Sequence, residues 1–250
     1  MAKQRRFRVD TLKDRKPGDA VALPPDEARH AKVLRLSATD VVEVFDASGL
    51  SADAVLETIH DNALVKLRTE PMRRSAYLIS ALKMTLAVAW PKGKRAAVLV
   101  QHCTEVGVSK IVPLKYARTV VSKDDESEGV QRLKRIAAEA AKQCGRSDVP
   151  EILPEREYSE ALRQFSENSF VLVLDPRAPQ DIVSLLWRER ESIGDKTVTL
   201  IVGPEGGFTD EELAAADTLG VHRVRMSEHV LRVETAAIAA LSITAAVLKA

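Results

Sequence analysis

The stretch LIVGPEGGFTDEEL, residues 200–213, predicts a strand, a tight glycine turn and a helix in direct succession. Residues 197–202 are β-branched and apolar, which suits a buried strand. The three glycines of residues 203–207 let the backbone approach a ligand closely or adopt positive φ. Thr209, followed three residues later by Glu212, forms a capping box that should begin a helix. Open α/β sheets bind small molecules where a strand ends beneath a helix N-terminus, although a plain strand-to-helix turn is the alternative.

The composition is that of an ordinary globular protein, with one local excess of positive charge. The chain has 250 residues, enough for one large or two ordinary domains, and is 45% hydrophobic and 29% charged. The net charge of +1 gives no general indication of nucleic-acid binding. Residues 1–35 nevertheless hold ten Lys and Arg against five Asp and Glu. This excess predicts either a local contact with a polyanion or a solvated basic face.

Nothing in the sequence indicates a metal site or a membrane. Cys103 and Cys144 belong to neither a CxxC pair nor a Cys/His ligand set, so we expect no metal. Two isolated cysteines fit a reducing cytoplasm. The first ten residues, MAKQRRFRVD, lack the apolar region of a signal peptide. No apolar run reaches the ~18–20 residues of a membrane helix, so we expect a cytoplasmic protein.

Residues 1–72 are predicted to form a small β-barrel domain. Short strands are expected at residues 19–23, 41–45, 51–57 and 63–68, with a hairpin turn at 46–49. Residues 24–36 should contain a short helix that begins after its prolines. Its inward face is expected to comprise Ala28, Ala31, Val33 and Leu34, and its outward face Arg29, His30, Lys32 and Arg35. The outward face suits contacts with an RNA backbone, although His30 alone is more commonly a surface or capping residue.

Residues 73–250 alternate between strand and helix patterns, which predicts an α/β domain. Strands are expected at residues 77–84, 86–89, 111–114, 169–175, 197–202 and 221–226. Helices are expected at residues 95–106, 130–144, 159–166, 182–190, 210–219 and 236–249. If the last three strands are neighbours in a parallel sheet, the loops after them converge at its carboxyl edge.

Several common ligand-binding and catalytic motifs are absent from the sequence, which reduces the possible classes of ligand and reaction. There is no GxxxxGK[ST] motif for a phosphate-binding loop and no GxGxxG after an early strand. There is also no GxSxG nucleophile motif. Backbone groups of loops can bind an adenine edge without any phosphate. We therefore expect a nucleoside-type cofactor held by loops.

Five segments together resemble one enzyme family. They are HAKVLRL (residues 30–36), QHCTEVGVSKIVPL (101–114), QCGRSDVPEI (143–152), GPEGGFT (203–209) and LRVETA (231–236). The glycine motif resembles SPOUT methyltransferases in general. The complete set, in this order, resembles the RsmE family of 16S ribosomal RNA uridine-N3 methyltransferases. The resemblance extends nearly from end to end.

The resemblance implies a fold, a cofactor and partners. The fold would be a C-terminal SPOUT α/β domain with a deep trefoil knot, plus a small N-terminal PUA-like β-barrel that binds RNA. S-adenosyl-L-methionine would bind bent within the knot, and the protein would be a homodimer. Its substrate would be one uridine near the decoding region of 16S rRNA in the 30S subunit. Ordinary topology rules argue against a knot, so this expectation comes from the resemblance alone.

The chemistry of uridine-N3 methylation suggests roles for three residues. The sulfonium methyl group is already activated, so the reaction needs no metal. Uracil N3 must lose a proton, and positive groups near O2 or O4 would stabilise the developing anion. Arg146 and Arg232 match motif positions and are the candidates, although each can instead contact a phosphate or form a structural ion pair. Glu205 can accept hydrogen bonds from the cofactor, act as a base, or cap the following helix.

The resemblance also implies binding residues. For the cofactor they are Leu174, Val202, Gly203, Pro204, Glu205, Gly206, Gly207, Met226, Leu231, Arg232, Thr235 and Ala236. Leu174 and Leu231 can also be ordinary core residues. For RNA they are Arg6, Arg8, His30, Arg35, Lys92, Lys94 and Arg95.

Several positions depart from the family pattern. Residues 226–229 (MSEH) lack the Gly and Arg that usually precede the Leu-Arg pair. Ala117 and Lys142 stand where Glu is common, His102 where Lys is common, and Arg8 where an aromatic residue is usual. Two alternatives therefore stay open. One is a SPOUT methyltransferase with another RNA target, and the other is a non-catalytic RNA-binding assembly factor.

Overall fold

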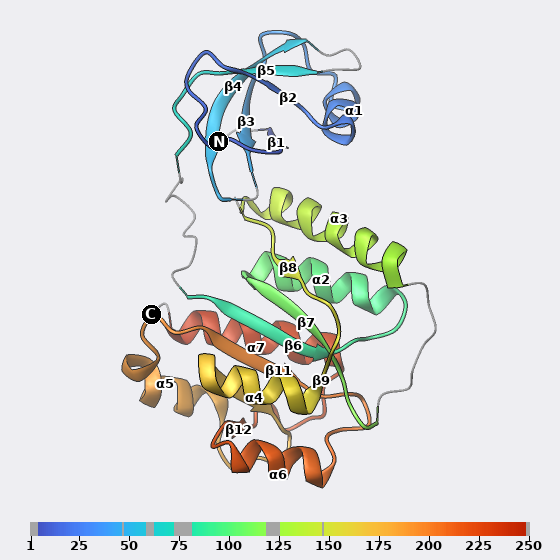
Figure 1. Cartoon of the computed structure of the whole chain (residues 1–250), viewed down its shortest axis with the longest axis vertical. Coiled ribbons are helices and arrows are strands. Elements are labelled where there is room, and N and C mark those ends of the chain that lie inside the picture. Colours follow the sequence, from blue (N-terminus) through green and yellow to red (C-terminus); the bar gives the residue numbers. More distant parts are fainter. Residues whose placement is uncertain are drawn as a thin grey trace. The chain divides into compact units, whose positions relative to one another are not determined.

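The computed structural model describes residues 5–46, 48–58, 63–72, 82–118, 126–146 and 148–248 (Figure 1). The chain divides into two compact units. The first comprises Met1–Ile79 together with Ala141–Val149, and the second comprises Ser80–Ala140 with Pro150–Ala250.

The first unit is built on a five-stranded sheet in the order β1-β3-β4-β5-β2. Its strands are β1 (Arg6–Arg8), β2 (Ala20–Ala22), β3 (Val41–Phe45), β4 (Ser51–Thr58) and β5 (Leu64–Leu67). Strands β3, β4, β5 and β2 pair antiparallel, and β1 runs parallel to β3. Helix α1 (Pro25–Val33) contributes Ala28 and Ala31 to the core. Four strands lie where the sequence predicts them, whereas β1, with only three residues, was missed.

The inward face of α1 was predicted only in part. Val33 is 74% exposed and Leu34 is 38% exposed, so the prediction that both face the core is wrong. The helix ends at Val33, and Leu34 is its C-cap. Arg35 then adopts left-handed backbone with φ of 53°, which is uncommon for a residue other than glycine. The chain turns there, and Leu36 enters the core instead.

The second unit contains a seven-stranded sheet in the order β12-β10-β11-β6-β7-β8, with β9 paired to β7. Its strands are β6 (Met84–Ala89), β7 (Lys110–Lys115), β8 (Glu151–Ile152), β9 (Arg156–Glu157), β10 (Phe170–Leu174), β11 (Val198–Val202) and β12 (His222–Val224). Every pairing is parallel, which confirms the predicted α/β sheet. Two strands were predicted in this region, at residues 77–84 and 86–89. The structure has one strand, β6, in the described part of the region. Residues 77–81 lie outside the described ranges.

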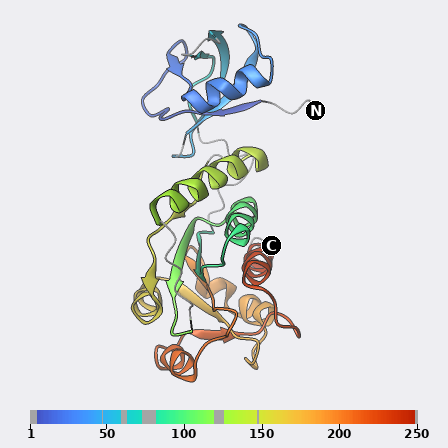
Figure 2. The same cartoon turned by 90° about the vertical axis from the view of Figure 1, so that its right-hand side faces the viewer.

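Helices cover both faces of this sheet. They are α2 (Lys94–Val106), α4 (Tyr158–Asn168), α5 (Ile182–Ile193), α6 (Asp210–Thr218) and α7 (Val233–Leu248). Helix α3 (Glu126–Cys144) contributes residues to both units. Helices α4 and α6 lie on one face, and α2, α5 and α7 on the other (Figure 2). Every residue of β6 and β11 is consequently buried, as expected for central strands of a doubly covered parallel sheet.

Helix α7 begins three residues earlier than predicted. Residues 233–235 were expected to be loop, but the first turn closes with a 2.8 Å hydrogen bond from the Ala236 N–H to the Arg232 carbonyl. Val233 and Glu234 are buried in this turn. Packing against the rest of the unit therefore extends the helix beyond its alanine-rich stretch.

Candidate functional site

Three neighbouring strands deliver their loops to one edge of the parallel sheet. Leu174, at the end of β10, pairs with Val202 of β11 on one side and with Val224 of β12 on the other. The three strands are therefore neighbours that end level with one another, which is the condition under which the sequence predicted converging loops. Strand β6 lies on the other side of β11, so the loop that leads to α2 begins at the same edge.

The glycine turn, residues 203–207, is shaped by two different requirements for glycine. The Gly207 N–H donates to the Pro204 carbonyl at 2.8 Å, and Gly207 has φ of 71°. At Gly203 the requirement is space, because an added Cβ would lie 2.8 Å from the Phe208 ring. Phe208 is only 6% exposed and packs edge-on against Tyr116. The turn is thus fixed by backbone conformation at one end and by side-chain packing at the other.

The predicted capping box is present at the start of α6. The Glu212 N–H donates to Thr209 Oγ1 at 3.1 Å, and the Thr209 N–H donates to Glu212 Oε2 at 2.8 Å. The Tyr158 hydroxyl donates to the Glu212 carbonyl at 3.1 Å. These bonds fix the point at which the turn becomes helix.

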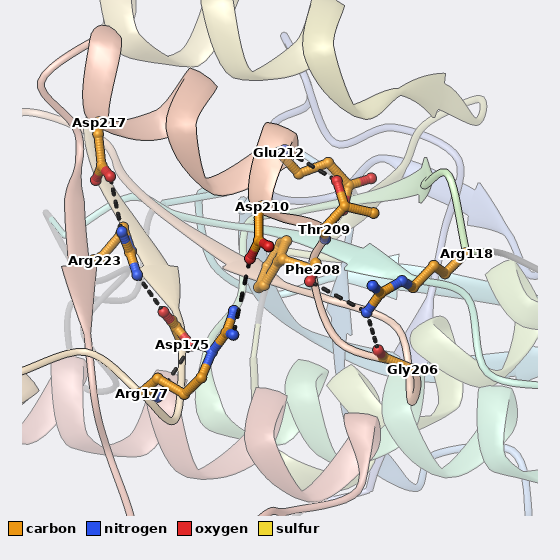
Figure 3. A network of polar contacts seen from close by, with 10 residues as sticks. All are labelled: Arg118, Asp175, Arg177, Gly206, Phe208, Thr209, Asp210, Glu212, Asp217 and Arg223. Carbon is orange, nitrogen blue, oxygen red and sulfur yellow. Dashed lines mark hydrogen bonds and ion pairs between the residues drawn. The ribbon is translucent and has the colours of Figure 1, made fainter.

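A segment distant in sequence contacts the turn and the two elements that flank it, and Figure 3 shows the contacts made by its Arg118. This bracing segment, residues 116–118, follows β7. The Tyr116 hydroxyl donates to the Val202 carbonyl at 3.0 Å, and the Ala117 N–H donates to Glu212 Oε1 at 3.0 Å. Arg118 Nη1 donates to the Gly206 carbonyl at 2.9 Å and, at 3.5 Å, to that of Phe208. The contacts of this segment with the turn were not predicted from the sequence, because the contacting residues are separated by more than eighty positions.

Charged side chains collect around the tip of the turn. Arg95, at the start of α2, forms an ion pair with Glu205. This hydrogen bond lowers the pKa of Glu205, and the nearby charges of Arg232 and Lys92 lower it further. The pair brings together a predicted RNA contact and a predicted catalytic residue. Glu205 is therefore held as a carboxylate whose partner is the Arg95 guanidinium.

A buried carboxylate fixes the base of the loop after β10 (Figure 3). Asp175 is 2% exposed and accepts from Arg223 Nη2 at 2.7 Å and from the Arg177 N–H at 3.0 Å. Burial opposes the ionisation of Asp175, yet these hydrogen bonds hold the pKa of its carboxyl below the ordinary value. Arg223 also donates to Asp217 of α6 at 2.8 Å. The network joins β10, β12 and α6 beside the site.

The predicted cofactor residues lie on these loops or at the ends of the strands and helix that they join. Leu174 and Val202 are buried, whereas Gly206 and Gly207 are exposed. Arg232 is exposed just before α7. Within the described contacts, the N–H groups of Glu205 and Gly206 have no protein acceptor. The turn therefore presents two backbone donors that a ligand can use.

The third catalytic candidate, Arg146, belongs to the first unit. Its Nη2 pairs with Asp148 Oδ2 at 2.6 Å, and its carbonyl accepts from Arg6 Nη1 at 3.1 Å. The Arg6 guanidinium also pairs with Glu43 at 3.1 Å and lies over the Phe45 ring. Arg6 and Arg146, predicted for RNA binding and catalysis, are thus both engaged in protein contacts within this unit.

The other predicted RNA contacts differ in exposure. His30 and Arg35 are exposed at the end of α1 in the first unit, and Arg8 is half-buried on β1. Lys92 and Lys94 are exposed beside the glycine-turn edge in the second unit. Over the described ranges, no helix is long and apolar enough to cross a membrane. The same residues include no group of three or more His, Cys, Asp or Glu placed to hold a metal.

Comparisons with known proteins agree with this architecture. Residues 79–245 match the family model of an RNA methyltransferase domain. The chain is 30% identical over 242 residues to ribosomal RNA small subunit methyltransferase E of Mycobacterium tuberculosis, covering 94% of this chain and 88% of that protein. It is similar to the structure of a ribosomal RNA small subunit methyltransferase E from Neisseria gonorrhoeae bound to S-adenosyl methionine, with 26% identity, a TM-score of 0.85 and 98% of both chains covered. A Legionella pneumophila structure, described as a methyltransferase with bound cofactor SAM, gives a TM-score of 0.85 at 28% identity, also with 98% of both chains covered. The chain therefore has an α/β methyltransferase fold and belongs to the RsmE family of ribosomal RNA small subunit methyltransferases.

Proposed function

We propose that this protein transfers a methyl group from S-adenosyl-L-methionine to N3 of a uridine in the 16S RNA of the small ribosomal subunit. The observation that carries the proposal is the glycine turn at the edge where β10, β11 and β12 end together. The family relationship supports the methyl transfer, and the structures of relatives with bound cofactor support the choice of donor.

The residues around the turn fit this cofactor. The N–H groups of Glu205 and Gly206 suit acceptors on the nucleoside, and the apolar side chains of Leu174 and Leu231 suit the faces of an adenine ring. A Cβ added at Gly207 would meet no atom within 4 Å, so that side of the turn adjoins open space. When bound, the cofactor supplies an electrophilic methyl group, and the protein has to hold and orient it.

The charges around the turn favour a division of roles. Glu205, with its lowered pKa, suits an acceptor for donor groups of the cofactor better than a base, because a lower pKa reduces its affinity for the N3 proton. Arg232 is exposed and positively charged, so it suits stabilisation of the negative charge that develops on uracil O2 or O4. Arg146 is proposed for the same role. Its guanidinium would then stabilise the uracil anion while it stays paired with Asp148.

The remaining features are proposed from the family resemblance. The segment from β11 through β12 to α7 would form the trefoil knot, and the first unit would be a PUA-like barrel. The order β12-β10-β11 is compatible with the knot, because the chain crosses β10 on its way from β11 to β12. RNA would contact His30, Arg35, Lys92 and Lys94, all of which are exposed. A homodimer is expected, and light scattering of the purified protein would measure its mass.

The test is methyl transfer to defined RNA. The full chain is incubated with methyl-labelled S-adenosylmethionine and with 30S subunits, 50S subunits or naked 16S RNA. We expect label in the small-subunit RNA and a block to reverse transcription at one uridine, because an N3 methyl group prevents Watson–Crick pairing. Label without such a block would indicate a different atom or base. Cofactor binding without any transfer, together with RNA binding that is independent of cofactor, would instead support a non-catalytic assembly factor.

A further inference from the structure

The bracing segment contacts the glycine turn, the strand before it and the helix after it. Tyr116 bonds to Val202 where β11 ends, Arg118 bonds to the Gly206 carbonyl, and Ala117 bonds to Glu212 in the first turn of α6. The segment is itself anchored, because Tyr116 is 3% exposed and stacks on Tyr158 with ring centroids 5.1 Å apart. A rigid strand end therefore supports a turn that is more than eighty residues away in sequence.

Arg118 fixes the second half of the turn, directly after the peptides that carry the N–H groups of Glu205 and Gly206. Its Nη1 donates to the carbonyls of Gly206 and Phe208, which flank the positive-φ residue Gly207. Its aliphatic stem lies beside Gly206, where an added Cβ would be 3.6 Å from Cδ of Arg118. The peptide between Gly206 and Gly207 is thus held from both sides, since its N–H donates to the Pro204 carbonyl.

We propose that Arg118 is a positioning residue that holds the glycine turn in its cofactor-binding shape. The inference rests on the proposed function and concerns the same site. By holding the carbonyls of Gly206 and Phe208, the guanidinium restrains the second half of the turn, and thereby the two preceding peptides that carry the N–H groups of Glu205 and Gly206. A ligand then meets donors that are already arranged, so less conformational entropy is lost on binding. An exposed arginine at this position could instead contact RNA, and the experiment separates the two roles.

The experiment compares Arg118→Met and Arg118→Lys in the full chain. Methionine keeps an apolar stem without charge, and lysine keeps the charge but loses the planar fork. Arg163→Met is the matched control, because Arg163 on α4 also donates to a carbonyl, that of Ser159 at 3.3 Å, outside the site. Calorimetric titration gives the Kd for S-adenosylmethionine, steady-state kinetics give KM for cofactor and for 30S subunits, and thermal unfolding reports the fold.

We expect Arg118→Met to raise the cofactor Kd and KM by about five- to tenfold, the effect of losing a charge-assisted hydrogen bond at an exposed site. The kcat at saturating cofactor should stay within about twofold of wild type. Arg118→Lys should recover part of the affinity, and Arg163→Met should match wild type. If Arg118→Met fails to fold, the lysine variant alone should still show a higher cofactor Kd.

Three outcomes would overturn the proposal. An unchanged cofactor Kd in both Arg118 variants would show that the turn keeps its shape without Arg118. A raised KM for 30S subunits with unchanged cofactor affinity would make Arg118 an RNA contact. Equal losses of affinity in the Arg118→Met and Arg163→Met variants would make the effect non-specific. Failure of the wild-type chain to bind cofactor would instead contradict the proposed function, so the two failures are distinguishable.

Discussion

The glycine turn and the final loop, residues 225–232, lie at the same edge of the sheet and are held very differently. The turn is braced by Arg118, packed against Phe208 and capped by Glu212. The final loop is paired at its start, where the Arg225 N–H donates to the Gln180 carbonyl at 2.8 Å. Beyond that point, within the described contacts, residues 226–231 share a single hydrogen bond, from the His229 N–H to Ser227 Oγ at 3.0 Å. Val230 is 82% exposed.

This difference indicates where ligand binding has its entropic cost. The turn is arranged before a ligand arrives, whereas the final loop has few contacts of its own to order it. If both loops enclose the cofactor, the turn binds it without changing conformation, and the final loop becomes ordered around it afterwards. Changes in the turn should therefore affect stability and binding together, and changes in the loop should affect binding alone.

The largest effect is expected for Gly203→Ala. The added methyl group would lie 2.8 Å from the ring of Phe208, which is buried and cannot move freely. Overpacking of this kind costs about 2–3 kcal/mol, to be measured by urea denaturation. Gly129→Ala in α3 is the control, because its added Cβ would meet no atom within 4 Å. This variant should be more stable than wild type by about 0.5–1 kcal/mol, because alanine has a higher helix propensity than glycine. Equal stability of the two variants would mean that the turn is not tightly packed.

A smaller effect is expected for Asp175→Asn, which alters the loop after β10 beside β12. The variant weakens the pair with Arg223 on β12 and should lose about 1–2 kcal/mol near neutral pH. Because the folded pKa of Asp175 lies below its unfolded value, this stability is complete above the unfolded pKa. It disappears as the pH falls through the folded pKa, so denaturation curves of variant and wild type should converge below about pH 4. A difference that stays constant with pH would contradict this account.

At the other end of the turn, Glu212→Ala should cost about 1 kcal/mol, because it removes the capping box and the bond to the Ala117 N–H. Glu212→Gln keeps one acceptor and should lose only part of this stability. Thermal unfolding of both variants measures the difference. A cost no greater for alanine than for glutamine would show that the bracing segment holds the turn without Glu212.

The smallest effect on stability is expected for Val230→Ser in the final loop. With the side chain 82% exposed, the change in unfolding free energy should stay below about 0.5 kcal/mol. Hydrogen exchange of residues 226–231 should be fast in the free protein and slower with S-adenosylmethionine. Strong protection already present without cofactor would remove the contrast between the two loops.

The features that could be predicted from the sequence are those that interactions between adjacent residues determine. The strand, the turn and the capping box at Thr209 follow from adjacent residues, and each is present. The start of α7 was missed because burial of Val233 and Glu234, rather than their helix propensity, extends the helix. The bracing by Arg118 was missed because no local pattern marks a contact between segments so far apart. The sequence therefore predicted the glycine turn and the capping box, and tertiary contacts determined which residues support them.

The order of strands also affects when the site can form during translation. Strand β11 lies between β10 and β6, and α7 packs against β6, β11 and α2. Residues 233–248, which form α7, emerge from the ribosome after every strand that they cover. The edge that carries the glycine turn is therefore completed only after α7 has been synthesised. A nascent chain stalled before residue 233 should expose apolar surface on β6 and β11, which makes it a substrate for chaperones or proteases rather than a partly active enzyme.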